Sequence, residues 1–371
     1  MKNKFTLPQL AWHGVKGMDI NLPDSWHTQA CSMAGYNKAP LKAAEIVPHV
    51  LAELAAAGIE DKQVRFICAS GCHGALNRND FVKKLGEDVL RRFPVYNHNP
   101  FDNCVYVGTT ASGTKISLNA EVMKCDLKIG VGSIVPHIMA GFGGGSKVIL
   151  PGVASYETAL ALHSPRQGNF SNTVTGMGAL ADNPRRKDID EAAKIAGLDM
   201  KIDGLVNMWG ETAELLAGAP QEEYAAALAA AKVHYLTPRV QDMDIAIANS
   251  FAKASEAVSG LMIAFSSIKQ QGGDAVLIAN APDGQATHYL LGPFGNTTAG
   301  KLALQIKIPR NINRLIILNE YPEIASGRYL EENSKVTMVE KWGEVMALLQ
   351  KDHVPGTRVA VYPNADIQYC E

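Results

Sequence analysis

The sequence predicts an α/β protein of two domains, each with a mostly parallel sheet flanked by helices. Its 371 residues exceed one ordinary core, because domains usually hold roughly 100 to 200 residues. Short β-branched runs alternate with segments of helical period, which is typical of strands joined by helical crossovers. The pattern breaks at Thr237-Pro238-Arg239. We therefore expect one domain over residues 1–240 and a smaller domain over 241–371.

Composition restricts the class of ligand. Hydrophobic residues make up 47% of the chain and charged residues 19%, which is typical of a globular protein with a large core. A net charge of -2 argues against binding to nucleic acid or to a membrane surface, since both need concentrated Lys and Arg. The six cysteines form no CxxC pair, and we find neither a leader peptide nor an apolar run near 18 residues. We expect a cytoplasmic protein that binds a small molecule.

In the first domain, the apolar runs near residues 7–12 and 20–22 predict an edge strand or hairpin, and residues 40–57 predict a helix bent at Pro48. The run VRFICAS predicts a strand whose following loop carries His73, and residues 79–92 predict a helix with a polar N-cap. His73 should thus lie at the carboxyl end of a parallel strand, where open α/β sheets bind ligands. Further strands are expected at 105–109, 115–118, 126–131 and across MKIDGLVNM, with helices at 188–197 and 221–233.

The second domain repeats the alternation with shorter spacing. Strands are expected at 245–249, 275–280, 315–318 and 358–361, and helices around 256–271 and 339–350. This order predicts a mostly parallel sheet of βαβ units.

The stretch over residues 131–163 holds two histidines, four glycines within five positions and a lysine, a combination that no packing argument requires. It is not a P-loop, because Ser146 rather than glycine precedes Lys147, and it is not a dinucleotide fingerprint, because that pattern's third glycine falls on Ser146. Glycines without Cβ atoms let backbone N–H groups approach an anion, so the segment suits a phosphate-bearing cofactor. A surface loop with a solvated lysine is the plainer alternative, although Pro136-His137 and Pro151-Gly152 fix both ends.

The segment PHIMAGFGGGSKVILPGVASYETALALHS resembles the signature of the nickel-pincer lactate racemase family, with its histidine, glycine cluster, lysine, PG pair and later histidine in this order. The segment ASGCHGALNRNDFVKKLGEDV resembles the TGxH-type loop of the same family. The resemblance implies nickel and a pyridinium-3,5-bisthiocarboxylic acid mononucleotide as cofactor, with cofactor biosynthesis enzymes as partners. It further implies that residues 1–240 form the cofactor-binding and catalytic domain, that the domain over 241–371 closes over the substrate, and that the active site lies in the cleft between them. The resemblance is specific in the first domain and general in the second.

The resemblance also implies roles for individual residues. His73 and His137 match the two acid/base histidines, and His163 matches the protein ligand to nickel. Lys147 matches the lysine that holds the cofactor, in some members covalently, and the matched segment around it is Gly143, Gly144, Gly145 and Ser146.

The implied chemistry is consistent with these residue types. Removing the hydrogen of a 2-hydroxy acid as hydride while a base takes the hydroxyl proton gives a planar keto acid, and hydride can return to either face. A base on each side of the carbon needs a pKa near neutrality, which histidine has. Imidazole is also an ordinary nickel ligand. We therefore expect a racemase or epimerase of a 2-hydroxy acid.

Departures from the family fall in the substrate shell. Tyr36 stands where the DHTRP-type segment has its acidic residue, and Ala39 stands where it has its arginine. Glu256 and Ser259 stand where the family's QAVKG segment has glutamine and lysine. Lactate is thus a doubtful substrate, and a different hydroxy acid or a sugar-derived acid is the better expectation. Lys38 or Lys253 could supply a replacement cation for the carboxylate, or be an ordinary surface charge.

Other readings stay open from the sequence. The same cofactor could serve a redox enzyme of the hydroxy acid dehydrogenase type, which would release a keto acid. A non-catalytic cofactor carrier would need Lys147 and His163 but neither His73 nor His137. A thiol nucleophile at Cys72 is a further alternative.

Overall fold

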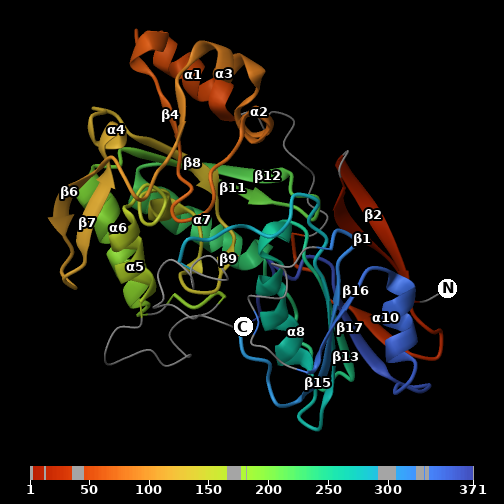
Figure 1. Cartoon of the computed structure of the whole chain (residues 1–371). Coiled ribbons are helices and arrows are strands. Elements are labelled where there is room, and N and C mark those ends of the chain that lie inside the picture. Colours follow the sequence, from red (N-terminus) through yellow and green to blue (C-terminus); the bar gives the residue numbers. More distant parts are fainter. Residues whose placement is uncertain are drawn as a thin grey trace.

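A six-stranded sheet organises the C-terminal half of the chain (Figure 1). The computed structural model describes residues 3–11, 14–35, 46–164, 177–180, 182–290, 306–322, 330 and 334–370. Every neighbouring pair in this sheet is parallel. In spatial order its strands are β16 (Val336–Val339), β15 (Ile312–Leu318), β14 (Gly273–Ile278), β13 (Ile245–Asn249), β17 (Arg358–Tyr362) and β3 (His27–Ala30).

The central strands β13 and β14 are buried on both faces, which explains their apolar runs IAIA and AVLI. Successive side chains point to opposite faces of a strand, so Ile245 and Ile247 join one core while Ala246 and Ala248 join the other. The alanine face packs on η3 (Ala254–Gly260) and α8 (Leu261–Ser267). The predicted mostly parallel sheet of the second domain is confirmed.

The opposite face of the sheet is covered by a hairpin and a helix. The hairpin consists of β1 (Lys4–Ala11) and β2 (Gly14–Asn21), which pair antiparallel as expected, and the helix is α10 (Trp342–Leu349). Leu7 and Ile20 of the hairpin share one core with Val345 and Leu349 of the helix. Burying such a side chain contributes about 1.5–3 kcal/mol.

The N-terminal half contains several small sheets in place of one large parallel sheet, and both parallel and antiparallel pairs occur in it. Parallel pairs join β4 (Phe66–Cys68) to β5 (Val95–Asn97) and β8 (Ile129–Ser133) to β11 (Met200–Val206). The antiparallel pairs arise where the connection is too short for a crossover. These pairs are β6 (Cys104–Thr109) with β7 (Lys115–Asn119), β11 with β12 (Thr212–Gly218), and β9 (Pro136–His137) with β10 (Gly141–Phe142).

Helices surround these sheets. They are α1 (Ile46–Ala56), η1 (Asp61–Gln63), α2 (Arg78–Leu85), α3 (Glu87–Arg92), α4 (Ala120–Met123), η2 (Gly145–Val148), α5 (Tyr156–His163), α6 (Pro184–Ala196) and α7 (Pro220–His234). The single helix expected over residues 79–92 is two helices, because Gly86 between them adopts φ 82°.

One strand crosses the expected domain boundary. β3 lies within residues 1–240 but pairs with β17 at the edge of the C-terminal sheet. Apart from β3, the assignment of residues to two domains divided at residue 240 stays a prediction.

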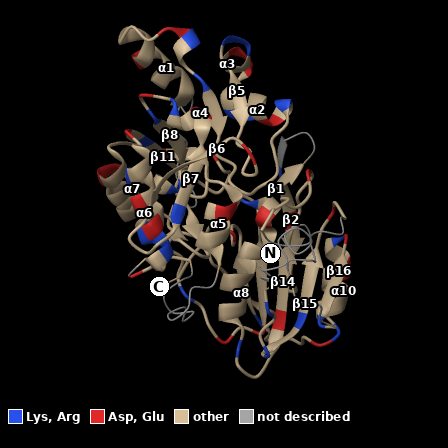
Figure 2. Ribbon diagram, turned by 60° about the vertical axis from the view of Figure 1, so that its left-hand side comes forward, with Lys and Arg blue, Asp and Glu red and all other residues tan. Residues whose placement is uncertain are grey.

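Lys and Arg are interspersed with Asp and Glu over the ribbon (Figure 2), in agreement with the small net charge. Among the described residues, none of the helices combines the length and apolar character that crossing a membrane requires.

Candidate active site

The loop after β4 carries His73 and is fixed from two sides. On one side, the Gly71 amide donates to the Gly152 carbonyl at 2.8 Å, which attaches the loop to the 131–163 stretch. Gly71 has φ 56°, and a Cβ there would lie 3.1 Å from the Pro151 carbonyl oxygen, so this close approach requires glycine. On the other side, the Tyr289 amide donates to the Cys72 carbonyl at 2.7 Å. The two halves of the chain therefore meet at His73.

The His73 side chain lies beside a carboxylate. Its Nε2 is 3.5 Å from Oε1 of Glu256, and each side chain is about two-fifths exposed, at 41% and 42%. The surrounding protein lowers the pKa of His73 by desolvation, while Glu256 raises it and the charges of Lys147 and Lys253 lower it. Glu256 thus stabilises the protonated imidazole of His73.

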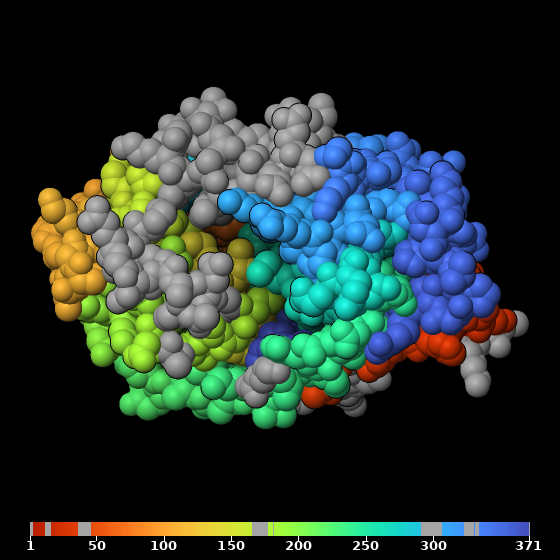
Figure 3. All heavy atoms as spheres, turned by 90° about the horizontal axis from the view of Figure 1, so that it is seen from below, coloured from red at the N-terminus to blue at the C-terminus, as the bar shows by residue number. Residues whose placement is uncertain are grey.

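The 131–163 stretch brings three predicted residues to one cavity. His137 lies on β9, Lys147 on η2, and His163 is the last residue of α5. These three line a small cavity together with Met139, Ala140, Pro151, Leu162, Arg185 and Ile189. Seen from below, the surface is hollowed between the yellow-green part of the chain and the teal part (Figure 3).

His163 is oriented as a metal ligand would be. Its Nδ1 lies 2.7 Å from the Ala159 carbonyl, and because a carbonyl only accepts, the ring proton is on Nδ1. Nε2 therefore keeps its lone pair, which is the arrangement that a backbone carbonyl imposes on metal-binding histidines. Burial first, and then the charges of Lys147 and Arg185, lower the pKa of His163 to about 4. The ring is neutral near pH 7 and available to a cation.

Lys147 has the acidity of a reactive amine. Burial first, followed by the positive charge of Lys253, lowers its pKa to about 7, against the opposing effect of Glu256. A substantial fraction of this amine is therefore neutral at physiological pH, as a nucleophilic or Schiff-base lysine requires.

His137 is held by the backbone of its own turn. Its Nδ1 accepts from the amides of Met139 and Ala140, both at 3.1 Å. Burial first, and then the charges of Lys147 and Lys253, lower its pKa well below the usual value.

The glycines are required here by packing. Gly144 and Gly145 adopt φ 70° and 55°, and a Cβ on Gly145 would lie 2.4 Å from the Tyr224 ring. The Gly145 amide donates to Asp203 at 2.6 Å, and the Gly143 amide donates to the Val135 carbonyl at 2.7 Å. These two amides thus have protein acceptors, unlike the expected anion-facing amides. Cofactor contacts of Gly143, Gly144, Gly145 and Ser146 stay a prediction.

The predicted substrate residues are only partly brought together. Lys253 donates from Nζ to the Pro136 carbonyl at 2.9 Å, which places it beside β9, and Glu256 lies against His73. Ser259 is 7% exposed, and its hydroxyl has no partner among the described residues. Tyr36 and Lys38 lie outside the described residues.

His288 is a site residue that the sequence did not indicate. Its ring lies edge-on to His73, with centroids 4.6 Å apart, and 5.9 Å from the ring of His163. The backbone bridge between His288 and His73 brings it there, and no local motif around THYL signals such a long-range pairing. His288 is 8% exposed, and burial, followed by its neighbouring histidines, lowers its pKa to about 2.

The thiol alternative loses support from the structure. Cys72 is 2% exposed, and burial raises the pKa of its thiol to about 12. It therefore stays a protonated core residue.

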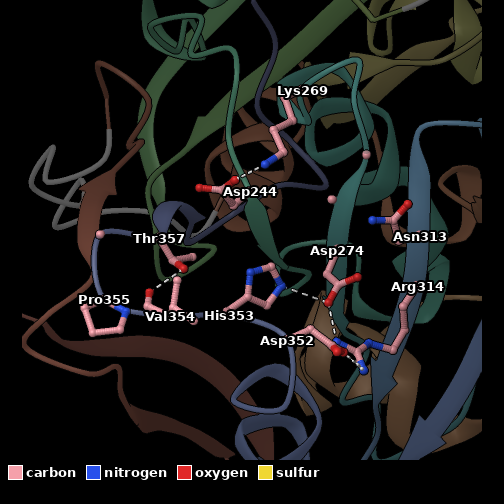
Figure 4. A pocket seen from close by; sticks show the side chains of 13 residues that line it. Asp244, Lys269, Asp274, Asn313, Arg314, Asp352, His353, Val354, Pro355 and Thr357 are labelled. Atoms are coloured by element: carbon pink, nitrogen blue, oxygen red, sulfur yellow. Dashed lines mark hydrogen bonds and ion pairs between the residues drawn. The ribbon is translucent and has the colours of Figure 1, made fainter.

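A larger pocket of about 760 Å³ lies at the opposite edge of the C-terminal sheet, where the parallel strands begin (Figure 4). Its charged side chains pair with one another: Asp274 with Arg314 and with His353, and Lys269 with Asp244. Such pairing identifies a structural ion cluster at that edge. Within the described ranges, no three His, Cys, Asp or Glu side chains form a group that could hold a metal ion.

Comparison with known proteins finds similarity to lactate racemases. The model of the lactate racemase N-terminal domain matches residues 37–173. The chain is 31% identical over 232 residues to the lactate racemase of Lactiplantibacillus plantarum, covering 60% of this chain and 54% of that protein. It is 31% identical over 163 residues to the lactate racemase of Thermoanaerobacterium thermosaccharolyticum, covering 43% of this chain and 38% of that protein. The chain thus spans about half the length, or less, of these curated relatives.

Solved structures show the same fold. The lactate racemase apoprotein from Thermoanaerobacterium thermosaccharolyticum superposes with a TM-score of 0.73 at 19% identity, covering 99% of this chain and 100% of that chain. A protein from Thermotoga maritima superposes with a TM-score of 0.62 at 16% identity, covering 93% of both chains. The α/β fold with its large parallel sheet is confirmed.

Proposed function

We propose that this chain, whose residues 37–173 match the lactate racemase N-terminal domain, racemises or epimerises a 2-hydroxy acid with a nickel-pincer nucleotide. The observation that carries the proposal is the cavity shared by His137, Lys147 and His163. His73 and Glu256 stand beside it from two different parts of the chain. A carrier without turnover would have no use for His73 and His137.

The residues present fit the cofactor. His163 offers an Nε2 lone pair, because its Nδ1 proton is bound by the Ala159 carbonyl. Lys147 offers an amine that is partly neutral near pH 7, and this amine would hold or covalently tether the nucleotide. When bound, the group would supply a reversible acceptor for the hydrogen on the substrate carbon. Cofactor biosynthesis enzymes are the partners that this scheme requires.

The protein's own part in the reaction is proton transfer and positioning. His73 takes the hydroxyl proton, and Glu256 stabilises the resulting imidazolium from 3.5 Å. His137 contacts the substrate from the other side of the cavity. His73 and His137 are the catalytic residues of the proposal.

The substrate shell favours an acid other than lactate. A carboxylate at Glu256 repels a substrate carboxylate and accepts hydrogen bonds from hydroxyl groups, which a sugar-derived acid has in number. Lys253, close to β9, is the described cation best placed to hold the substrate carboxylate.

The proposal is tested with protein co-expressed with cofactor-making enzymes and given single enantiomers of several 2-hydroxy acids. Chiral chromatography should show each pure enantiomer approaching a mixture, with no keto acid released. Accumulation of a keto acid would instead favour the redox alternative. If nickel-loaded protein changes none of these acids, the racemase proposal is wrong.

A further inference from the structure

Residues 284–290 form a segment that joins two parts of the site. This segment follows β14, and η3 follows β13, so both leave the parallel sheet at its carboxyl edge. The Ala286 amide donates to the Ser255 carbonyl of η3 at 2.7 Å. Next along the segment, the Thr287 carbonyl accepts from the Gly74 amide, in the loop after β4, at 2.9 Å. The segment is therefore attached to η3 at one end and to the loop after β4 at the other.

Gln285 is the side chain of this segment that binds η3. Its Nε2 donates to the Ala254 carbonyl at 2.8 Å, and its Oε1 accepts from the Ala257 amide at 3.1 Å. Both ends of the glutamine amide thus bind the backbone of η3. The two backbone groups lie on either side of Glu256 in the sequence.

The backbone of η3 is kinked at the residue that Gln285 spans. Glu256 has φ -124° and ψ 43°, which are not helical angles, so η3 consists of two short turns that meet at this residue. A kink of this kind lacks the regular hydrogen bonds that fix a continuous helix. The two bonds from Gln285 cross the kink and hold the turns in one relative orientation.

The kink determines where the Glu256 carboxylate lies. The direction of a side chain depends on the backbone conformation of its residue, so a regular helical turn would direct this carboxylate elsewhere. In the kinked conformation, Oε1 of Glu256 lies 3.5 Å from Nε2 of His73. The partner that stabilises the protonated ring of His73 is therefore in place because of a backbone conformation that Gln285 holds.

We propose that Gln285 is a positioning residue for the reaction: by binding both sides of the kink in η3, it holds the Glu256 carboxylate beside His73. This inference rests on the proposed racemase function. Gln285 takes no part in proton transfer, and His73 and His137 keep their acid/base roles. Because Gln285 acts through Glu256, its contribution to turnover should disappear when Glu256 has no carboxylate.

A double-mutant cycle in nickel-loaded enzyme distinguishes this role from a general structural one. Methionine is about as long as glutamine but makes neither hydrogen bond. Gln285→Met should lower kcat about 10-fold in the wild-type background and less than about 2-fold in the Glu256→Ala background, because residues that act through one another are not additive. The exposed Gln221→Met is the matched control and should leave kcat unchanged in both backgrounds. Nickel content and intact mass of every variant check its loading.

An equal loss of kcat in the two backgrounds would overturn the inference. If Gln285→Met does not fold, Gln285→Glu replaces it in the cycle, since it has the shape of glutamine and keeps an acceptor for the Ala257 amide but cannot donate to the Ala254 carbonyl. A smaller loss of kcat in the Glu256→Ala background is again the expected result.

A crystal structure of the cofactor-free variant provides a measurement that does not depend on turnover. It should show the Glu256 carboxylate withdrawn from His73, and a carboxylate that stayed in its wild-type place would contradict the inference. If nickel-loaded wild-type protein racemises none of the acids, the proposed function is wrong. The crystal structure would still decide whether Gln285 holds Glu256 beside His73.

Discussion

Lys147 combines a cavity position with a lowered pKa, and this has a direct chemical consequence. An amine reacts as its neutral form, so a pKa of about 7 predicts half-maximal reactivity near neutral pH. We expect the rate at which Lys147 is acylated in cofactor-free protein to rise between pH 6 and 8. Peptide mass spectrometry after a short exposure to an amine-acylating reagent measures the extent of labelling at each pH. Ordinary exposed amines in the same digest gain reactivity only toward about pH 10. Labelling of Lys147 that follows those amines would show that its environment does not lower the pKa.

Lys253 is the described cation expected to hold the substrate carboxylate. Its Nζ is fixed by the Pro136 carbonyl at 2.9 Å. Losing a charge-assisted hydrogen bond costs about 1.5–3 kcal/mol, so Lys253→Met should raise KM on the order of 10- to 100-fold with a smaller effect on kcat. Steady-state kinetics with the exposed Lys62→Met as a control checks this. If Lys253→Ala and Lys38→Ala both leave KM unchanged, neither lysine binds the carboxylate.

The sequence named His73, His137, Lys147 and His163 as candidates because they belong to recognisable segments, and the last three line one cavity; their roles stay predictions. The structure added what spacing along the chain does not contain, namely the ring nitrogen that each histidine presents. That property depends on neighbours such as the Ala159 carbonyl, whose direction the fold determines.

At the scale of elements, the turn into η2 is the feature most sensitive to substitution. Gly145→Ala would place a Cβ 2.4 Å from the Tyr224 ring at φ 55°. Gly197→Ala is the matched control, since Gly197 has φ 65° but no atom within 4 Å of its Cβ position. We expect Gly197→Ala to cost about 1 kcal/mol from backbone strain alone and Gly145→Ala to cost several kcal/mol. Urea unfolding measures the free energy of unfolding of both variants. Equal decreases would mean that the turn rearranges to accommodate the methyl group without a clash.

Glu223 of α7 makes stability depend on pH. Both carboxylate oxygens are buried without a hydrogen-bond partner among the described residues, and burial, followed by Asp203, raises the pKa to about 7. Between about pH 4.5 and 7 the folded protein therefore binds more protons at this site than the unfolded chain, so the free energy of unfolding falls as pH rises.

Glu223→Gln removes that dependence. Relative to wild type, it should raise the free energy of unfolding at pH 8 by on the order of 1–3 kcal/mol and have little effect at pH 4.5. Urea unfolding at several pH values checks this, with the exposed neighbour Glu222→Gln as a control. If the free energy of unfolding varied with pH in the same way for wild type and Glu223→Gln, Glu223 would not be the source of the pH dependence.

Elements with a strong local pattern were predictable, as the strand IAIAN and the helix at 221–233 illustrate. Boundaries set by one backbone angle were not, since Gly86 is compatible with a helix interior or a break until its φ is known. Strand direction in the N-terminal half was also not predictable, because it depends on partners distant in the sequence.

For the whole molecule, the decisive contacts join distant parts of the chain. β3 pairs with β17 across more than three hundred residues, and the Tyr289 amide binds the His73 loop at the Cys72 carbonyl. The spacing of hydrophobic residues along the chain indicates neither contact. The second contact brings His288 beside His73, next to a site predicted mainly from residues 131–163.

The central claim is that this site holds a nickel-pincer nucleotide at Lys147 and His163. The most direct measurement is nickel analysis with native and denaturing mass spectrometry on protein co-expressed with the cofactor-making enzymes. We predict one nickel and one added nucleotide per chain in the native protein, with nickel lost in His163→Ala but kept in the exposed control His49→Ala. Wild-type protein that carries neither nickel nor added mass under these conditions would contradict the account.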